Sequence, residues 1–418
     1  MVPREGSFRS TGHVRRGAIW PFHRQLYGLR LRVMPPEPVV IDRGGVDALI
    51  AALRSRGYRT IGPVVRNGAI VHAEISSVAD LPAGWHDEQA PGSYRIHHNE
   101  DDDELFGWAV GPQSFKASLF PPASIVWRGR RDSGGLLVEQ ATDEAPPEAF
   151  FGARPCEVAG MSVLGTVLSG GAYPDPNCAR HQSSGFVVAV ECGAPASTCF
   201  CSSMGSGPSA TEGFDIALTE LTSAGDHRFL ARAGTEKGQS VLDEIPQREL
   251  KEKDREDRHG VIERSREIIT RHLDASAVPS LLARNLEHPR WEDVAERCLA
   301  CGNCTLVCPT CFCAATSERT NLSGEIQLER RWDSCFDLAH SYLHGGSVRV
   351  STRSRYRQWM THKLSTWVDQ FGMSGCVGCG RCITWCPVGI DITEEVSAIA
   401  ETDGATMTNE VPLQPSEA

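Results

Sequence analysis

The chain has 418 residues, 16 cysteines and a formal charge of −11. Its length allows two or three domains, and its acidic balance argues against nucleic acid as the main partner. Its longest apolar runs, such as Phe186–Val190, are too short to span a bilayer. No apolar signal segment is visible near the start, so we expect a cytoplasmic protein. In that compartment clustered cysteines bind metal more often than they form disulfides.

The sequence of the first two thirds of the chain indicates a tail, a folded domain and a connector. Residues 1–33 carry seven Arg and one Glu, and we expect a basic tail that is disordered or not native. Residues 34–240 alternate strand-like and helical segments, starting with a strand and an amphipathic helix at 40–57, and predict a mixed α/β domain. Residues 241–290 are dense in charges of both signs and predict an exposed helical connector.

A cysteine motif occurs twice in the segment 291–400, which precedes a short tail at 401–418. Residues 298–309 have the sequence CLACGNCTLVCP, and residues 376–387 have CVGCGRCITWCP. Each is C-x2-C-x2-C-x3-C-P, the ferredoxin pattern for 4Fe–4S clusters, in which the fourth cysteine of one motif ligates the cluster of the other. The predicted ligand sets are Cys298, Cys301, Cys304 and Cys386 for one cluster, and Cys376, Cys379, Cys382 and Cys308 for the other.

These motifs predict a mostly helical, ferredoxin-like 4Fe–4S dicluster domain after the α/β domain, and place the chain in the α+β class. The alternative is a pair of zinc sites, because C-x2-C is also zinc-ribbon spacing. Zinc does not account for the third cysteine, the x3 step and the proline occurring together twice.

The tetrapeptide TCFC also occurs twice, at 198–201 and at 310–313. The first copy shares its domain with two other cysteines, and the four predict a third iron–sulfur cluster, with a zinc site or buried thiols as alternatives; they are Cys156, Cys192, Cys199 and Cys201. The second copy supplies Cys311 and Cys313, which together with Cys335 could lie beside the clusters, replace a ligand or pack. Cys178 has no evident partner, and we expect it to be a packing residue.

A family resemblance rests on these motifs and their surroundings. The segments FFGARPCEVAGMSVL, VECGAPASTCFCSSMGSGP, RRWDSCFDLAHSYLHGG and GCVGCGRCITWCPVGIDI resemble the β subunit of sulfhydrogenases, the NAD(P)-linked nickel–iron hydrogenases. They are also similar to the A subunit of anaerobic sulfite reductases. The resemblance covers about residues 115–395. It implies a C-terminal dicluster domain and a role as an electron conduit. The implied partners are a flavoprotein subunit that handles NAD(P)H and the hydrogenase small subunit, or the corresponding sulfite reductase subunits.

Motifs for substrate chemistry are missing from the sequence. It has no nucleotide-binding glycine motif after a strand, no nucleophile elbow and no zinc-protease motif. We therefore predict no catalytic residue and an electron-transfer role within a larger oxidoreductase. The alternatives are a self-contained flavin and iron–sulfur oxidoreductase, and a zinc-binding scaffold without redox chemistry.

The first prediction concerns metal content. Two cubane sites and a third site imply about 8–12 iron atoms per chain, with as much acid-labile sulfide. Iron and sulfide analysis of the anaerobically purified protein measures both numbers. Stoichiometric zinc without sulfide would contradict the ferredoxin interpretation.

Overall fold

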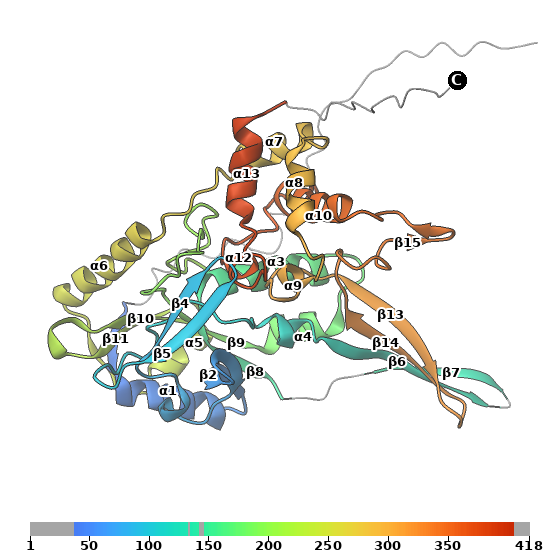
Figure 1. The fold of residues 1–418 in the computed structure, drawn as a ribbon. Coiled ribbons are helices and arrows are strands. Elements are labelled where there is room, and N and C mark those ends of the chain that lie inside the picture. The colour runs from blue at the N-terminus through green and yellow to red at the C-terminus, as the bar shows by residue number, and fades with distance from the viewer. Residues whose placement is uncertain (1–36, 133, 142–145, 405–418) are drawn as a thin grey trace, which may run out of the picture. The chain divides into compact units, whose positions relative to one another are not determined.

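The computed structural model describes residues 37–132, 134–141 and 146–404, and these residues lie in one compact unit. The predicted basic tail and all but the first four residues of the predicted C-terminal tail lie outside the described residues. Within these ranges, eight strands form a mixed sheet in the order β12-β1-β11-β10-β9-β8-β2-β3 (Figure 1). Its strands are β1 (Val39–Asp42), β2 (Arg59–Arg66), β3 (Ala69–Glu74), β8 (Glu148–Ala153), β9 (Phe186–Val190), β10 (Ile216–Leu221), β11 (Arg228–Ala233) and β12 (Arg248–Glu249).

The centre of this sheet is parallel and its edges are antiparallel. Strands β2, β8, β9 and β10 run parallel to one another, whereas β3, β11, β1 and β12 join the sheet by antiparallel pairing. Parallel strands need crossover connections, and helices supply part of these. The helices of this region are α1 (Arg43–Ser55), α2 (Lys116–Leu119), α3 (Pro155–Ser169), α4 (Pro176–Ser184), α5 (Glu236–Leu242) and α6 (Glu252–Ile268).

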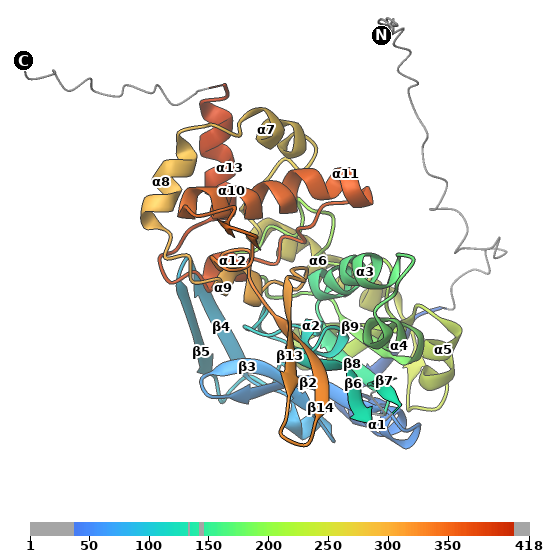
Figure 2. The same ribbon diagram turned by 90° about the vertical axis from the view of Figure 1, so that its right-hand side faces the viewer.

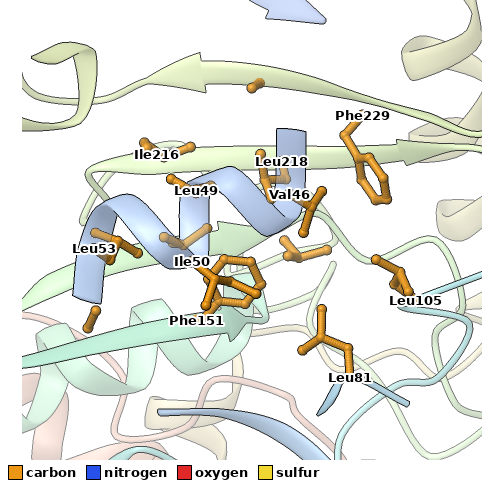
Figure 3. Packing of buried hydrophobic residues seen from close by; sticks show 14 of the residues in the cluster. Val46, Leu49, Ile50, Leu53, Leu81, Leu105, Phe151, Ile216, Leu218 and Phe229 are labelled. Carbon is orange, nitrogen blue, oxygen red and sulfur yellow. The ribbon is translucent and has the colours of Figure 1, made fainter. Parts of the chain in front are cut away.

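Helix α1 shows how the sequence builds the main core. Asp42 caps the helix, since its carboxylate accepts a hydrogen bond of 2.8 Å from the Gly45 amide. The apolar residues at helical spacing, Val46, Leu49, Ile50 and Leu53, are all fully buried. They face Phe151, Ile216, Leu218 and Phe229 of the sheet (Figure 3). The strand and helix expected at 40–57 are therefore confirmed.

The C-terminal part is a group of short helices around the cysteine motifs (Figure 2). They are α7 (Val278–Arg284), α8 (Arg290–Arg297), α9 (Asn303–Leu306), α10 (Thr352–Thr361), α11 (Trp367–Phe371), α12 (Arg381–Thr384) and α13 (Ile392–Glu401). Residues His362–Thr366 form a π-helical turn that joins α10 to α11. None of the helices in the described ranges combines the length and the apolarity needed to cross a membrane.

The expected α+β class is confirmed, whereas the mostly helical character of the second part holds only loosely. The insertion between the two motifs contains a hairpin, β13 (Ala314–Thr320) and β14 (Glu325–Trp332), and a shorter one, β15 (Tyr342–Leu343) and β16 (Gly346–Ser347). Strand β14 pairs with β6 (Ala123–Asp132), which pairs with β7 (Gly135–Gln140). The four-stranded sheet is thus built from two distant parts of the chain, which local pattern does not predict.

A further hairpin from the first part lies against the second motif. Strands β4 (Trp85–Ala90) and β5 (Ser93–His98) are joined at Gly92, whose amide donates to the carbonyl of Ile383 at 3.1 Å. The ring of Tyr94 lies 5.0 Å from that of Trp385. The segments predicted as separate domains are therefore in direct contact.

The charged connector is anchored by a buried carboxylate. Asp254 of α6 is 2% exposed, and it accepts hydrogen bonds from Arg248 at 2.7 Å and Arg228 at 2.8 Å. The hydrogen bond from Arg248, followed by that from Arg228, holds the pKa of Asp254 well below its ordinary value. Part of the segment expected to be exposed therefore packs against the sheet.

We predict that Asp254→Asn lowers the free energy of unfolding by about 2 kcal/mol at neutral pH, because it removes the buried carboxylate that accepts hydrogen bonds from both Arg228 and Arg248. Arg228 keeps its ion pair with Asp257, which limits the loss. Since the folded pKa is depressed, this contribution is fully present above about pH 4, the unfolded value, and is lost as the pH falls through the lowered pKa. Anaerobic urea unfolding at several pH values measures both effects. The control is Glu263→Gln on the same helix, which removes an exposed pair with Arg266 and should cost less than about 1 kcal/mol. Equal losses in both variants would contradict the prediction.

Candidate metal centres

Both cysteine motifs form tight loops in which small residues adopt left-handed backbone angles. Ala300 and Gly302 have φ values of 52° and 77°, and Gly378 and Gly380 have 63° and 77°. Gly302 and Gly380 also precede the short helices α9 and α12. Such angles are rare for residues with a side chain, so these positions favour small residues. Both loops are therefore as tightly wound as the motif predicts.

The first predicted ligand set surrounds one cavity, which we call site A. It consists of Cys298, Cys301, Cys304 and Cys386, so the fourth cysteine of the second motif lies with the first three of the first. The amides of Ala300 and Ile390 donate to the sulfurs of Cys298 and Cys386 at 3.4 and 3.3 Å. The structure thus brings together the crossed set that the motif spacing predicts, while ligation itself stays a prediction.

Site A contains two buried hydrogen-bond donors that could interact with an anionic group. Tyr356 and Trp359 line the same cavity, and their Oη and Nε1 atoms are buried without a hydrogen-bond partner among the described residues. Burial raises the pKa of Tyr356 well above its ordinary value, so its hydroxyl stays protonated and can donate. Buried donors normally have partners. The sulfur atoms of a bound cluster would supply them, so the residues present fit such a group.

The second predicted set, which we call site B, is more deeply placed. Burial raises the pKa of Cys376 to about 12, and it raises the pKa of Cys382 well above its usual value, with added repulsion from Cys376, Cys379 and Cys308. Cys308 differs, because the adjacent Cys311 thiol and the Lys363 ammonium hold its pKa well below the ordinary value. The set contains Cys308, Cys376, Cys379 and Cys382.

The third set, which we call site C, is buried inside the first part of the chain. Its members come from the start of α3 and from the loops after β9, and each is less than 9% exposed. Burial raises the pKa of Cys199, with repulsion from Cys201 and Cys192, and raises that of Cys201, with repulsion from Cys156 and Cys192. The four sulfurs therefore lie within electrostatic reach of one another; they are Cys156, Cys192, Cys199 and Cys201.

A buried arginine joins the segments that carry site C. Arg154 is fully buried and directly precedes Pro155, the first residue of α3. Its guanidinium donates to the carbonyls of Glu191 at 3.3 Å, Ala109 at 3.1 Å and Phe106 at 2.8 Å. Because Glu191 adjoins Cys192, this one side chain positions two of the cysteine-bearing segments.

Site C and site B are in backbone contact. The amide of Phe200 donates to the carbonyl of Gly378 at 2.9 Å, and the Ser206 hydroxyl donates to the carbonyl of Val377 at 2.5 Å. Cys382 of site B also lines the cavity of site A. The three sites therefore form a contiguous series, with site B between the other two.

A second buried guanidinium lies between site B and site C. Arg381 is 1% exposed and forms an ion pair of 2.7 Å with Glu157. Glu157, then the nearby sulfurs of Cys379 and Cys156, outweigh burial and raise the pKa of Arg381. Its Nη1 atom is buried without a hydrogen-bond partner among the described residues. This donor also fits an anionic group beside Cys379.

The remaining cysteines lie beside site B or in the core. Cys311 hydrogen bonds to Cys308, and Cys313 hydrogen bonds to Cys335, which lowers the pKa of Cys313 to about 6. Cys178 is fully buried in α4, as expected of a packing residue. The second TCFC copy therefore lies next to a predicted ligand, and whether its sulfurs take part in ligation stays open.

The cysteine sulfurs are spaced more widely than the ligands of a single zinc ion. In the part of the chain that the structure describes, the group of three or more donor atoms within 4.8 Å of one another is His86, Asp102 and Glu104, and not a cysteine set. Sulfurs around one tetrahedral zinc ion lie about 3.8 Å apart, given Zn–S bonds of about 2.3 Å. No three cysteine sulfurs among the described residues lie that close to one another.

Sequence reasoning missed the charged and polar side chains around these cysteines. Lys363 and Arg381 resemble ordinary helix residues in the sequence, as do Tyr356 and Trp359. No motif marks them, because their role depends on contacts with cysteines up to 225 positions away, as for Arg381 and Cys156. A charged residue on the inner face of a helix is the one weak signal that could have drawn attention to them.

Comparison with known proteins agrees with this geometry. Residues 297–390 match the family described as 4Fe-4S dicluster domain. The second part of the chain is thus an iron–sulfur domain of that class. The chain is similar to sulfhydrogenase 2 subunit beta of Pyrococcus furiosus, with 29% identity over 320 residues; the match covers 74% of this chain and 90% of the relative. The resemblance stated from the sequence is confirmed. No solved structure matches the chain.

We predict that Cys386→Ser damages the spectroscopic signal of site A, although Cys386 belongs to the second motif, because its side chain lies with Cys298, Cys301 and Cys304. Cys308→Ser should damage the signal of site B. Electron paramagnetic resonance of the reduced protein measures both, after Cys301→Ser and Cys379→Ser have assigned the signals. A Cys386→Ser variant that loses the same signal as Cys379→Ser would contradict the crossed arrangement.

Proposed function

We propose that this chain is the iron–sulfur electron-transfer subunit of a cytoplasmic, multisubunit oxidoreductase. In this proposal it relays electrons between a flavoprotein subunit that uses NAD(P)H and a nickel–iron hydrogenase core. Sites A and B would each hold a 4Fe–4S cluster, and site C would hold a third iron–sulfur cluster. Such clusters supply one-electron exchange at cysteine-bound iron.

The observation that carries the proposal is the contiguity of the three cysteine sites. Backbone contacts join the loop of site C to the loop of site B, and Cys382 of site B reaches the cavity of site A. Residues from both parts of the chain contribute to this series. A single catalytic pocket would not need three sulfur sets in a row, whereas a relay does.

The protein side chains would do three kinds of work. The cysteines would hold the metal, and the backbone amides of the motif loops would donate to the sulfurs. Burial would keep water away from sites B and C. At site A, Cys301 is exposed and its neighbour Leu299 is 63% exposed. This surface would allow a partner subunit to approach site A closely.

Two observations support the proposed partners: the name of the similar protein and the acidic charge of this chain. The similar protein is named as a hydrogenase subunit, and the relay geometry suits a component that has no substrate site of its own. The sequence outside the basic tail carries about −17, so basic patches on partner subunits would assist docking.

We predict that the isolated chain reduces neither NAD(P)+ nor protons at a useful rate, and that adding it to its partners couples NAD(P)H oxidation to hydrogen turnover. Deleting it should abolish this coupling while the hydrogenase core still reduces an artificial dye. Full coupling without the chain would overturn the relay role. Sulfite-dependent NAD(P)H oxidation in place of hydrogen turnover would assign the chain to a sulfite reductase, and flavin bound to the isolated chain would favour a self-contained oxidoreductase.

A further inference from the structure

Lys363 occupies an unusual place in the fold. It lies in the π-helical turn His362–Thr366 between α10 and α11, and it is only 3% exposed. Lysine is almost never fully buried unless it is paired, and π-helical turns are rare and concentrate at functional sites. Both features indicate that this ammonium group has a functional role.

The contacts of Lys363 use all three of its N–H groups. Its Nζ donates to the sulfur of Cys308 at 3.4 Å, to the hydroxyl of Thr310 at 2.9 Å and to the carbonyl of Gly375 at 3.0 Å. In the described residues no carboxylate lies within ion-pair distance of it. The negative charge that compensates this buried cation is therefore on sulfur, at a predicted ligand of site B.

The surroundings of Lys363 suit a charged ammonium group. Burial by itself disfavours the ammonium form, but the Nζ atom has three acceptors, one of which is the sulfur of Cys308 at 3.4 Å. An isolated buried ammonium costs several kcal/mol. The residues around Lys363 are thus arranged for an anionic group at site B, and a cluster bound by four thiolates is such a group.

Site A offers a matched comparison. The Ala300 amide donates to Cys298 in site A, and the Gly378 amide donates to Cys376 in site B, both at 3.4 Å and both at the same motif position. The two sites therefore share this backbone donor. They differ at the cysteine from the opposite motif, since Cys386 in site A accepts from the Ile390 amide at 3.3 Å and Cys308 in site B accepts from the buried ammonium. The positive charge of Arg355 lies near Cys298 in site A and favours its thiolate form. However, Arg355 is partly exposed, so solvent screens its charge.

Two other buried cations lie near site B, and their partners differ from those of Lys363. Arg381 is paired with Glu157 at 2.7 Å, so the carboxylate offsets most of its charge. Lys116 is also buried, but it donates to the carbonyls of Thr305 and Leu306 at 3.3 and 2.9 Å and not to a ligand sulfur. Arg381 also hydrogen bonds to a predicted ligand sulfur, that of Cys379, but it shares its charge with Glu157. Of these three cations, Lys363 combines a contact to a ligand sulfur with the lack of a carboxylate partner in the described residues.

We propose that Lys363 raises the reduction potential of the cluster at site B. One-electron reduction adds a negative charge to the cluster, and a nearby ammonium stabilises the reduced form more than the oxidised form. Hydrogen bonds to sulfur act in the same direction. Lys363 thereby contributes to a difference in reduction potential between site B, the middle of the series, and site A. This inference rests on the proposed function only in requiring an iron–sulfur cluster at site B.

The test is a redox titration of the full chain, followed by electron paramagnetic resonance, in the wild type and in Lys363→Met. The variant should lower the ratio of reduced to oxidised cluster at site B at least tenfold at a given solution potential, which is 59 mV for a one-electron couple. The site A signal serves as an internal control and should move much less. Lys363→Arg keeps the charge and should retain most of the wild-type potential.

Lys116→Met is the matched control, since it also removes a buried ammonium near site B but leaves the sulfur contact intact, and it should shift the site B potential less than Lys363→Met. An unchanged site B potential in Lys363→Met, or equal shifts at sites A and B, would overturn the proposal.

A second measurement applies if Lys363→Met does not assemble. In wild-type protein carrying 15N only in lysine side chains, the reduced site B cluster should show a hyperfine coupling to a lysine nitrogen, which the backbone donor Gly378 cannot supply. Absence of any such coupling would overturn the proposal. A wild-type chain without a cluster at site B would overturn it together with the proposed cofactor. If the wild-type chain does not couple NAD(P)H oxidation to hydrogen turnover, while Lys363→Met still shifts the site B potential, only the proposed function is contradicted.

Discussion

The contact between the loop at 198–201 and the loop at 376–382 is the interaction on which the site depends. A Cβ atom added at Gly378 would lie 2.6 Å from the carbonyl oxygen of Phe200, and one added at Gly380 would lie 2.6 Å from that of Thr198. These distances are too short for any side chain, so the two backbones touch directly. Glycine in the motif therefore serves both the winding of its own loop and the approach of site C. Without this approach the cysteines of the first part would be separated from those of the second.

Further contacts between the two parts of the chain hold the described residues in one compact unit. The β4–β5 hairpin reaches the second motif at Ile383, and Lys116 reaches α9 at Leu306. Strand β6 supplies a partner for the hairpin inserted between the motifs. Each of these contacts crosses the boundary that composition suggests near residue 290. The α/β part is thus a scaffold that encloses one side of the cysteine region and is not an independent neighbour of it.

Buried charge is the second organising feature. Arg154, Arg381 and Lys363 are all nearly inaccessible to solvent, yet each has a different form of compensation. Arg154 binds backbone carbonyls, Arg381 binds Glu157, and Lys363 binds a cysteine sulfur. Burying three cations is costly unless each is satisfied. Their positions next to the cysteine sets indicate that the interior is built for anionic groups and not for an apolar core alone.

The sequence by itself determined the local features, because they depend on short spacings. The cysteine motifs with their prolines predict paired clusters, the apolar period of residues 46–53 predicts α1, and the family resemblance follows from the same segments. The crossed grouping of Cys386 with the first motif also follows from the motif, and the structure places it there. Tertiary structure alone decided that site C touches site B, that the insertion forms a sheet with β6, and that Lys363 donates to Cys308. These relations join residues that lie 55 or more positions apart. Their energies come from packing and desolvation, and no local pattern of residues encodes either.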